Sequence, residues 1–407
     1  MSLIHLLALP RVFQASPLRA DSDTAQMLDA IQSVGGLSGV GRWFVGDWLL
    51  ENGFYRPISS ASLALDYALY GEHTWGYCLT NWLLLWAIAL GTALMVPRLL
   101  GVSPSWGWGV AIAISAQYTG LARALGSHSS WWGALAVLGG VWVARSGIQG
   151  SVQRLLRWEL LLAVGALFWG WDRMLSADYT RLIEWVPSRT ALLGTAFAVW
   201  AVVCWLVGLE RRQWGWVGIG GALYLLGLGA YEQPIMLAPF LLTVMWVRRR
   251  ESARQILQVA GAIIACVVLI ALLRVSLVTT EPTRYQRQQL RSTLSGPVLT
   301  YLSDLVPPIS QWHYWRAVGW EPMVWFFKQP WDHLVGLVLY VGVGTAFFRD
   351  WKRFRYGIGW HALTLLPMAF LHFFEHYMVL PQVGKTLTDC LLIGWGAERV
   401  RALAGGV

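Results

Sequence analysis

The sequence predicts an all-α fold: a polytopic membrane helix bundle of about eleven or twelve transmembrane helices, given the bilayer's thickness. Hydrophobic residues make up 56% of the 407 residues, whereas Asp, Glu, Lys and Arg together make up 13%, about half of the share in soluble domains. The chain also contains 27 Trp, whose amphipathic rings favour the headgroup region of a bilayer. Long apolar runs follow one another along the chain. We therefore expect a single transmembrane domain over residues 1–407 and no separate soluble domain.

The candidate spans follow from the lengths of the apolar runs, because a bilayer core about 30 Å thick requires roughly 20 helical residues. Residues 3–16 are apolar but short, and Arg11 interrupts them, so they form either a truncated first span or an interfacial anchor. They lack the charged start and the cleavage site of a signal peptide. The runs of suitable length lie near 78–96, 106–122, 131–145, 158–172, 190–208, 214–230, 233–247, 257–278, 331–348, 357–374 and 385–402.

Lys and Arg are distributed unevenly among the connecting segments. By the positive-inside rule, the connections rich in these residues are cytoplasmic. Two long segments, 14–77 and 279–330, then face outward, and we expect a multi-pass protein of a bacterial inner (plasma) membrane. The bases of the cytoplasmic set are Arg98, Arg145, Arg154, Arg157, Arg211, Arg212, Arg248, Arg249, Arg250, Arg254, Arg349, Lys352, Arg353, Arg355, Arg399 and Arg401. The alternate short connections carry only Arg123, Arg173, Arg181, Arg189 and Lys385.

The two external segments are expected to carry short amphipathic helices. Residues 58–70 fit such a helix, and residues 43–51 fit another, with Asp47 and Glu51 on one face. The segment 279–330 mixes bases with aromatic residues, a composition that fits lipid headgroups or a lipid-linked phosphate. The net charge of +9 therefore indicates membrane lipids as partners and no nucleic acid.

Four stretches of the sequence, in order, carry a resemblance to a known family. The first is Tyr-Arg-Pro-Ile-Ser-Ser at 55–60, continued by Leu-Asp-Tyr at 65–67, Trp-Gly-Tyr at 75–77 and Asn81. The others are 183–193, the Tyr-Glu-Gln-Pro of 231–234 with Leu-Ala-Pro at 237–239, and 375–381. Together they resemble the polyprenol-dependent membrane glycosyltransferases of the GT-C superfamily, in the protein O-mannosyltransferase-like branch related to the TMTC proteins.

The resemblance implies transfer of a sugar from a polyprenyl-phosphate donor to a protein, glycan or lipid acceptor on the periplasmic or lumenal side. In that family, an Asp soon after the first span is the catalytic base. The matching segment is Asp21-Ser22-Asp23, where Asp23 is the leading candidate and Asp21 the second. A base within reach of the acceptor hydroxyl suits this chemistry, and Arg suits the leaving phosphate. The candidate substrate-binding residues are Arg56, Arg189, Glu232, His376, Arg284 and Arg287.

The sequence also departs from the family pattern, which leaves an alternative function open. Tyr231 stands where the family has Lys, His376 stands where it has Arg, and Ser22 separates the two Asp. These differences remove two expected phosphate partners. The alternative is therefore a catalytically inactive GT-C-like accessory or scaffold subunit of a membrane complex. No tetratricopeptide repeat occurs in this sequence, so we expect no acceptor recruitment through such repeats.

Other chemistries have weaker signals. Asp21-x-Asp23 also matches the divalent-metal motif of nucleotide-sugar transferases, but no nucleotide-binding fold accompanies it. His372, Glu375 and His376 have the spacing of an inverted zinc protease motif without an evident third ligand. The four Cys lack metal-ligand spacing. No cofactor is expected, with a divalent metal at Asp21 and Asp23 as the open alternative. A transporter is disfavoured because no internal repeat pair is evident.

Overall fold

The computed structural model describes residues 2–119, 159, 162–163, 166–167, 179–248, 253–278, 281–290, 343–372 and 375–404. In these residues the regular structure is helical, and an isolated antiparallel bridge joins Leu290 to Leu371. The all-α prediction is confirmed for this part of the chain. The spans predicted at 131–145, 158–172 and 331–348 lie wholly or largely outside the described residues, as does most of the segment 279–330.

The long helices coincide with the predicted apolar runs. Three helical segments are long and apolar enough to cross a membrane: Thr74–Leu100, Val186–Arg211 and Ile256–Leu277. Two more, Trp214–Ala230 and Gln233–Met245, are apolar but shorter. The described residues therefore contain three helices that could cross a membrane, and the larger number of spans expected from the sequence stays a prediction. The long helices are α5 (Thr74–Leu100), α6 (Pro104–Thr119), α11 (Arg189–Arg211), α12 (Trp214–Ala230), α13 (Leu237–Arg248), α14 (Ala253–Leu277), α20 (Trp351–Ala369) and α21 (Val379–Ala404).

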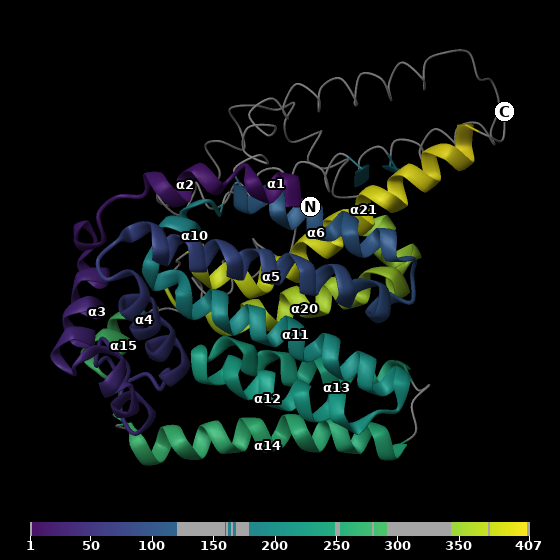
Figure 1. Ribbon diagram of the computed structural model, residues 1–407. Helices are drawn as coiled ribbons and strands as arrows, with labels where there is room; N and C mark the ends of the chain where they lie inside the picture. The colour runs from purple at the N-terminus through teal and green to yellow at the C-terminus, as the bar shows by residue number, and fades with distance from the viewer. Residues whose placement is uncertain are drawn as a thin grey trace.

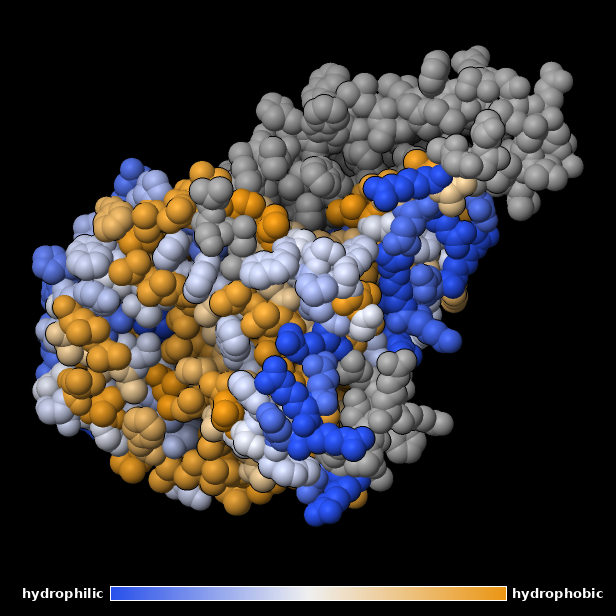
Figure 2. Space-filling view, turned by 45° about the vertical axis from the view of Figure 1, so that its right-hand side comes forward, coloured by the Kyte–Doolittle hydropathy of each residue, from blue (hydrophilic) through white to orange (hydrophobic). Residues whose placement is uncertain are grey.

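The ends of the bundle differ in charge. Arg98, near the end of α5, pairs with Glu210 near the end of α11 at 3.5 Å, and Lys352 and Arg353 begin α20 at the same end. This end lies on the right of Figure 1, whereas the short helices α3 (Ser22–Ser33), α4 (Pro57–Tyr70) and α15 (Arg284–Gln289) lie on the left. Figure 2 shows hydrophilic residues gathered over the end that carries the bases and hydrophobic residues over much of the flank.

The apolar surface of α14 points to an environment other than water. Only 11% of its apolar window is buried inside the structure, and Leu257 and Leu272 are 71% and 61% exposed. A continuous apolar helix face of this kind is unfavourable in water. Helices that face lipid need no such cover, because lipid tails are as apolar as Leu.

The N-terminal segment does not form a span. Residues 3–16 fold into two short helices, α1 (Ser2–Leu6) and α2 (Leu9–Gln14), neither of them long enough to cross a bilayer. The helix predicted over 58–70 is confirmed as α4.

The prediction of a helix over 43–51 is wrong. The 3-10 helix η2 (Gly36–Phe44) ends where the helix was expected to begin. The Asp47 carboxylate instead accepts hydrogen bonds from the backbone N–H groups of Trp48, Gly53 and Phe54. An Asp that satisfies backbone donors in this way competes with helix formation.

Candidate functional site

A cavity of about 350 Å³ lies between the short helices and the ends of the long ones. It is bounded by α3, the loop 45–56, α15, the 3-10 helix η4 (Gln233–Met236) and the 3-10 helix η6 (Glu375–Met378). All four family-like stretches contribute to its lining, although they are far apart in the sequence. The contributors from these stretches are Arg56, Trp185, Pro187, Thr190, Tyr231, Glu232, Gln233, His376 and Tyr377.

Segment 281–290 closes one side of this cavity. The Thr283 hydroxyl donates to the backbone oxygen of Asn52 at 2.9 Å, and the Gln286 amide donates to that of Gly53 at 2.8 Å. Thr283 and Gln286 also form the capping box that begins α15. The two predicted external segments therefore contact each other directly at the cavity.

Arg56 holds a central position in the lining. Its guanidinium donates to both Glu232 oxygens, at 3.1 Å from Nε and 2.8 Å from Nη2. The rings of Trp48, Phe54 and Tyr231 lie 4.8, 4.1 and 4.8 Å from its Cζ atom. A planar fork matches both the carboxylate and the aromatic faces. Arg56 is thus fixed in one orientation with its charge already compensated.

Replacing Arg56 with Lys is expected to lower the free energy of unfolding by about 1–3 kcal/mol. An ammonium group keeps the charge but can neither bind Glu232 through two parallel hydrogen bonds nor contact the three rings through a planar, delocalised cation. Thermal or denaturant unfolding in detergent micelles measures the effect. Arg42→Lys is the matched control, because its ion pair with Glu51 is exposed and such pairs contribute little. Equal losses in the two variants would contradict this account of Arg56.

The structure separates the two candidate catalytic acids. The Asp21 carboxylate is the N-cap of α3, accepting from the Thr24 backbone N–H at 2.9 Å and from the Thr24 hydroxyl at 2.6 Å. Asp23 lies in the first turn of the same helix and lines the cavity, which Asp21 does not. Partial desolvation, followed by the nearby charge of Asp21, raises the pKa of Asp23. A raised pKa is typical of a carboxyl group suited to accept a proton.

Replacing Asp21 with Ala is expected to destabilise the protein by about 0.5–2 kcal/mol through loss of the helix cap. Asp21→Ser is the matched control, since Ser can also cap the helix, and it should retain most of the stability. Unfolding of both variants in the same detergent measures the difference. An Ala variant as stable as wild type would show that the cap contributes little.

His376 is neutral in its observed surroundings. Burial, followed by the charges of Arg56 and Arg181, lowers its pKa to about 3. Its ring lies 4.9 Å from the Trp185 ring and 4.4 Å from the Tyr377 ring, between centroids. His376 lines the cavity as an imidazole without charge, so it is not a cationic partner for phosphate.

Arg189 lies outside the cavity, contrary to the substrate-binding role predicted for it. Its side chain is 0% exposed. It donates to the side chains of Asn81, Ser62 and Asp66 at 2.7, 2.9 and 2.6 Å and to the backbone oxygen of Tyr77 at 3.0 Å. Because these partners belong to α4 and α5, Arg189 joins both helices to α11 and has a structural role.

The positions of Arg284 and Arg287 also differ from what their predicted role in substrate binding requires. Both are exposed on α15 and neither lines the cavity. The cavity face of α15 consists instead of Tyr285, Gln286 and Gln289. Short helices were expected in the segment 279–330, but none was located at 284–289, so the two faces of α15 could not be distinguished from the sequence.

Arg274 and Gln233 are among the lining residues to which the sequence reasoning assigned no role. Arg274, in the last turn of α14, lines the cavity, and no carboxylate in the described part of the chain forms an ion pair with it. A lone Arg inside the apolar run 257–278 was the available signal, since ionisable residues in spans are often functional. Gln233 is buried, and its amide nitrogen donates to the backbone oxygens of Thr364 and Tyr377. Its Oε1 atom has no partner among the described residues.

Within the described ranges, no three His, Cys, Asp or Glu side chains lie close enough to hold a metal ion. Comparison with protein-family models, with curated proteins and with solved structures gave no match. The resemblance to the GT-C superfamily therefore rests on the four stretches themselves.

Proposed function

We propose that this chain is a membrane glycosyltransferase of the GT-C type, which transfers a sugar from a polyprenyl-phosphate donor to an acceptor hydroxyl. The observation that supports this proposal is the convergence of all four family-like stretches on the cavity that contains Asp23. Residues that merely resembled the family by chance would have no reason to meet in one place.

The lining residues suit the steps of this reaction. Asp23 takes the proton from the acceptor hydroxyl, whose oxygen forms the new bond to the anomeric carbon of the sugar. The bond between that carbon and the phosphate oxygen breaks, and polyprenyl phosphate leaves with the electron pair. Arg274 supplies positive charge for this phosphate. The Oε1 atom of Gln233 can accept a hydrogen bond from a sugar hydroxyl.

The proposed topology puts the cavity on the outer side of a bacterial inner membrane. The short connections at the opposite end of the bundle carry bases, around the ends of α5 and α11 and the start of α20, and the positive-inside rule assigns such connections to the cytoplasm. We propose about eleven spans in total, from the apolar runs of suitable length. The acceptor is a protein, a glycan or a lipid.

The test is turnover by the purified protein in detergent, with a panel of polyprenyl-phosphate sugars and release of polyprenyl phosphate as the readout. Release by wild type that is lost in Asp23→Asn and kept in Asp21→Asn would support both the reaction and the assignment of the base. Loss in Asp21→Asn alone, with the fold intact, would move the base to Asp21. No turnover with any donor by a stably folded protein would contradict the proposal.

The second candidate is an inactive accessory subunit built on the same fold. One observation favours it: Arg56 is already paired with Glu232 and packed among aromatic rings. With Tyr231 and His376 both uncharged, Arg274 is the one lining cation without an ion pair among the described residues. Co-purification of a partner subunit that covers the cavity, together with no turnover, would select this candidate.

A further inference from the structure

A second cavity, of about 640 Å³, lies at the opposite end of α20 from the candidate site. Lys352 and Tyr356 line it near the start of the helix, whereas Met368 lines the candidate site near its end. At 1.5 Å per residue, roughly 24 Å along the helix axis separates Lys352 from Met368. The second cavity is therefore separate from the site proposed for sugar transfer.

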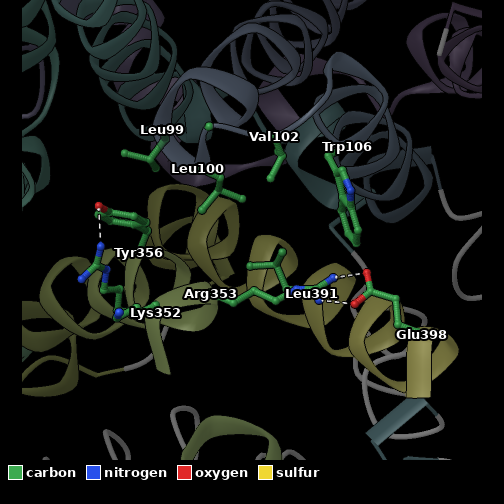
Figure 3. Close-up of a pocket in the computed structure, with 11 residues that line it drawn as sticks. Leu99, Leu100, Val102, Trp106, Lys352, Arg353, Tyr356, Leu391 and Glu398 are labelled. Atoms are coloured by element: carbon green, nitrogen blue, oxygen red, sulfur yellow. Dashed lines mark hydrogen bonds and ion pairs between the residues drawn. The ribbon is translucent and has the colours of Figure 1, made fainter. Parts of the chain in front are cut away.

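The second cavity has two chemically different walls. Leu99, Leu100 and Val102, from the end of α5 and the turn that follows it, form an apolar wall. The bases at the start of α20 form the other wall, and Figure 3 shows Lys352 and Arg353 on the opposite side of the cavity from Leu99, Leu100 and Val102. A ligand that fills such a space must combine an apolar part with a polar one.

Arg353 does not contribute free charge to this cavity. Its guanidinium donates to both Glu398 oxygens, at 2.6 and 2.9 Å, and its Cζ lies 5.3 Å from the centre of the Trp106 ring. Figure 3 shows the fork of Arg353 directed at Glu398, with Trp106 alongside. This pair forms a fixed and electrically neutral border of the cavity.

Lys352 and Arg355 are different, because no carboxylate in the described part of the chain pairs with either of them. The Arg355 guanidinium donates to the Tyr356 hydroxyl at 3.1 Å. Its Nε atom is buried and has no acceptor among the described residues. A buried donor without an acceptor costs free energy, more so when it is charged. Lys352 and Arg355 therefore give the cavity two positive charges that no carboxylate among the described residues compensates.

We propose that this cavity binds the phosphate of an anionic phospholipid headgroup, with Lys352 and Arg355 on the phosphate and Leu99, Leu100 and Val102 against the first methylene groups of the lipid. Arg readily donates to phosphate oxygens. Basic pockets between helix ends at the cytoplasmic surface suit such headgroups. A soluble phosphate would fill only the polar half of the cavity. The proposal is independent of whether the protein transfers sugars.

The experiment measures binding of a fluorescent phosphatidylglycerol to the purified full-length protein in a neutral detergent. Lys352→Gln combined with Arg355→Gln is expected to weaken binding about tenfold or more, because two charge-assisted contacts are lost. Arg211→Gln combined with Arg401→Gln is the matched control: it removes the same charge from exposed positions outside the cavity and should leave binding within about twofold. Phosphatidylcholine should compete poorly in wild type.

Several results would overturn the proposal. Equal loss of binding in both double variants would show that only overall charge matters, and equal competition by phosphatidylcholine would show that charge does not matter. Displacement of the fluorescent lipid by millimolar inorganic phosphate would assign the cavity to a soluble anion. If the double variant does not fold, Lys352→Gln alone tests the same point at an exposed residue and should weaken binding in the same direction.

Discussion

Replacing Asp23 with Asn is expected to lower kcat for sugar transfer about 10²–10⁴-fold, the usual contribution of a positioned general base. Asn keeps the size of the side chain and one acceptor oxygen but cannot take up the proton. Asp23 lies in the first turn of α3 and lines the cavity, while the neighbouring Asp21 is occupied with the helix cap. Release of polyprenyl phosphate under saturating donor measures the effect.

The pH dependence provides an independent check on the same residue. The base must be ionised to act, so kcat/KM should rise with pH through the pKa of Asp23. Desolvation and the charge of Asp21 raise this pKa, so the acid limb should lie at higher pH than the ordinary pKa of an Asp would give. The limb should disappear from the residual activity of Asp23→Asn. An acid limb that persists unchanged in the variant would assign it to another group.

Stability separates a catalytic role of Asp23 from a structural one. Because its pKa is raised in the folded protein, the folded state binds the Asp23 proton more tightly than the unfolded state does. The stability that this protonation contributes is present at low pH and is lost as pH rises through the folded pKa. At neutral pH the ionised group therefore costs stability. Asp23→Asn should be at least as stable as wild type while it loses activity.

The sequence was most informative about the elements and least informative about contacts between them. The apolar runs located α5, α11, α12 and α14, because a helix that must lie among other helices or lipid tails needs little else than apolar residues. The helix expected at 43–51 does not form, because the Asp47 carboxylate accepts hydrogen bonds from the backbone of the loop. Helical spacing of apolar residues could not reveal that competition.

In the candidate site, too, the sequence identified residues better than it identified their contacts. The resemblance located Asp23, Arg56, Glu232 and His376, which all line one cavity. Whether an Arg faces the cavity or the interior depends on which helices pack around it, and the sequence contains no such information. Arg189 also sits in a family-like stretch, yet it is completely buried.

Replacing Arg189 with Met is expected to destabilise the protein by about 3–5 kcal/mol, the usual cost of removing one partner of a buried ion pair. Met has a similar length and fills the space, so the loss is mainly electrostatic. The substitution removes the donors that bind Asn81, Ser62 and the Tyr77 backbone. It also leaves the Asp66 carboxylate, 5% exposed, without its cation. Unfolding in detergent micelles measures the loss.

Two companion variants identify the source of this effect. Arg11→Met is the matched control: its ion pair with Glu184 is 42% and 40% exposed, so the loss should stay below about 1 kcal/mol. Asp66→Asn added to Arg189→Met should recover part of the stability, since no charge then remains buried. The Asp66→Asn variant is also measured alone. If the loss of stability in the double variant equals the sum of the losses in Arg189→Met and Asp66→Asn, Arg189 and Asp66 are not energetically coupled.

The loss in Arg189→Met should also depend on pH in a definite direction. Burial already raises the pKa of Asp66, and Arg189 opposes that shift. Without the guanidinium, the pKa of Asp66 should rise further, so the folded variant keeps a protonated, neutral carboxyl at low pH. As pH rises through this pKa, the buried group ionises and stability falls. Arg189→Met should therefore be nearer to wild type in acid than in base, and the Asp66→Asn addition should remove this pH dependence. A loss that is the same at all pH values would show that the missing hydrogen bonds, and not the unpaired charge, account for it.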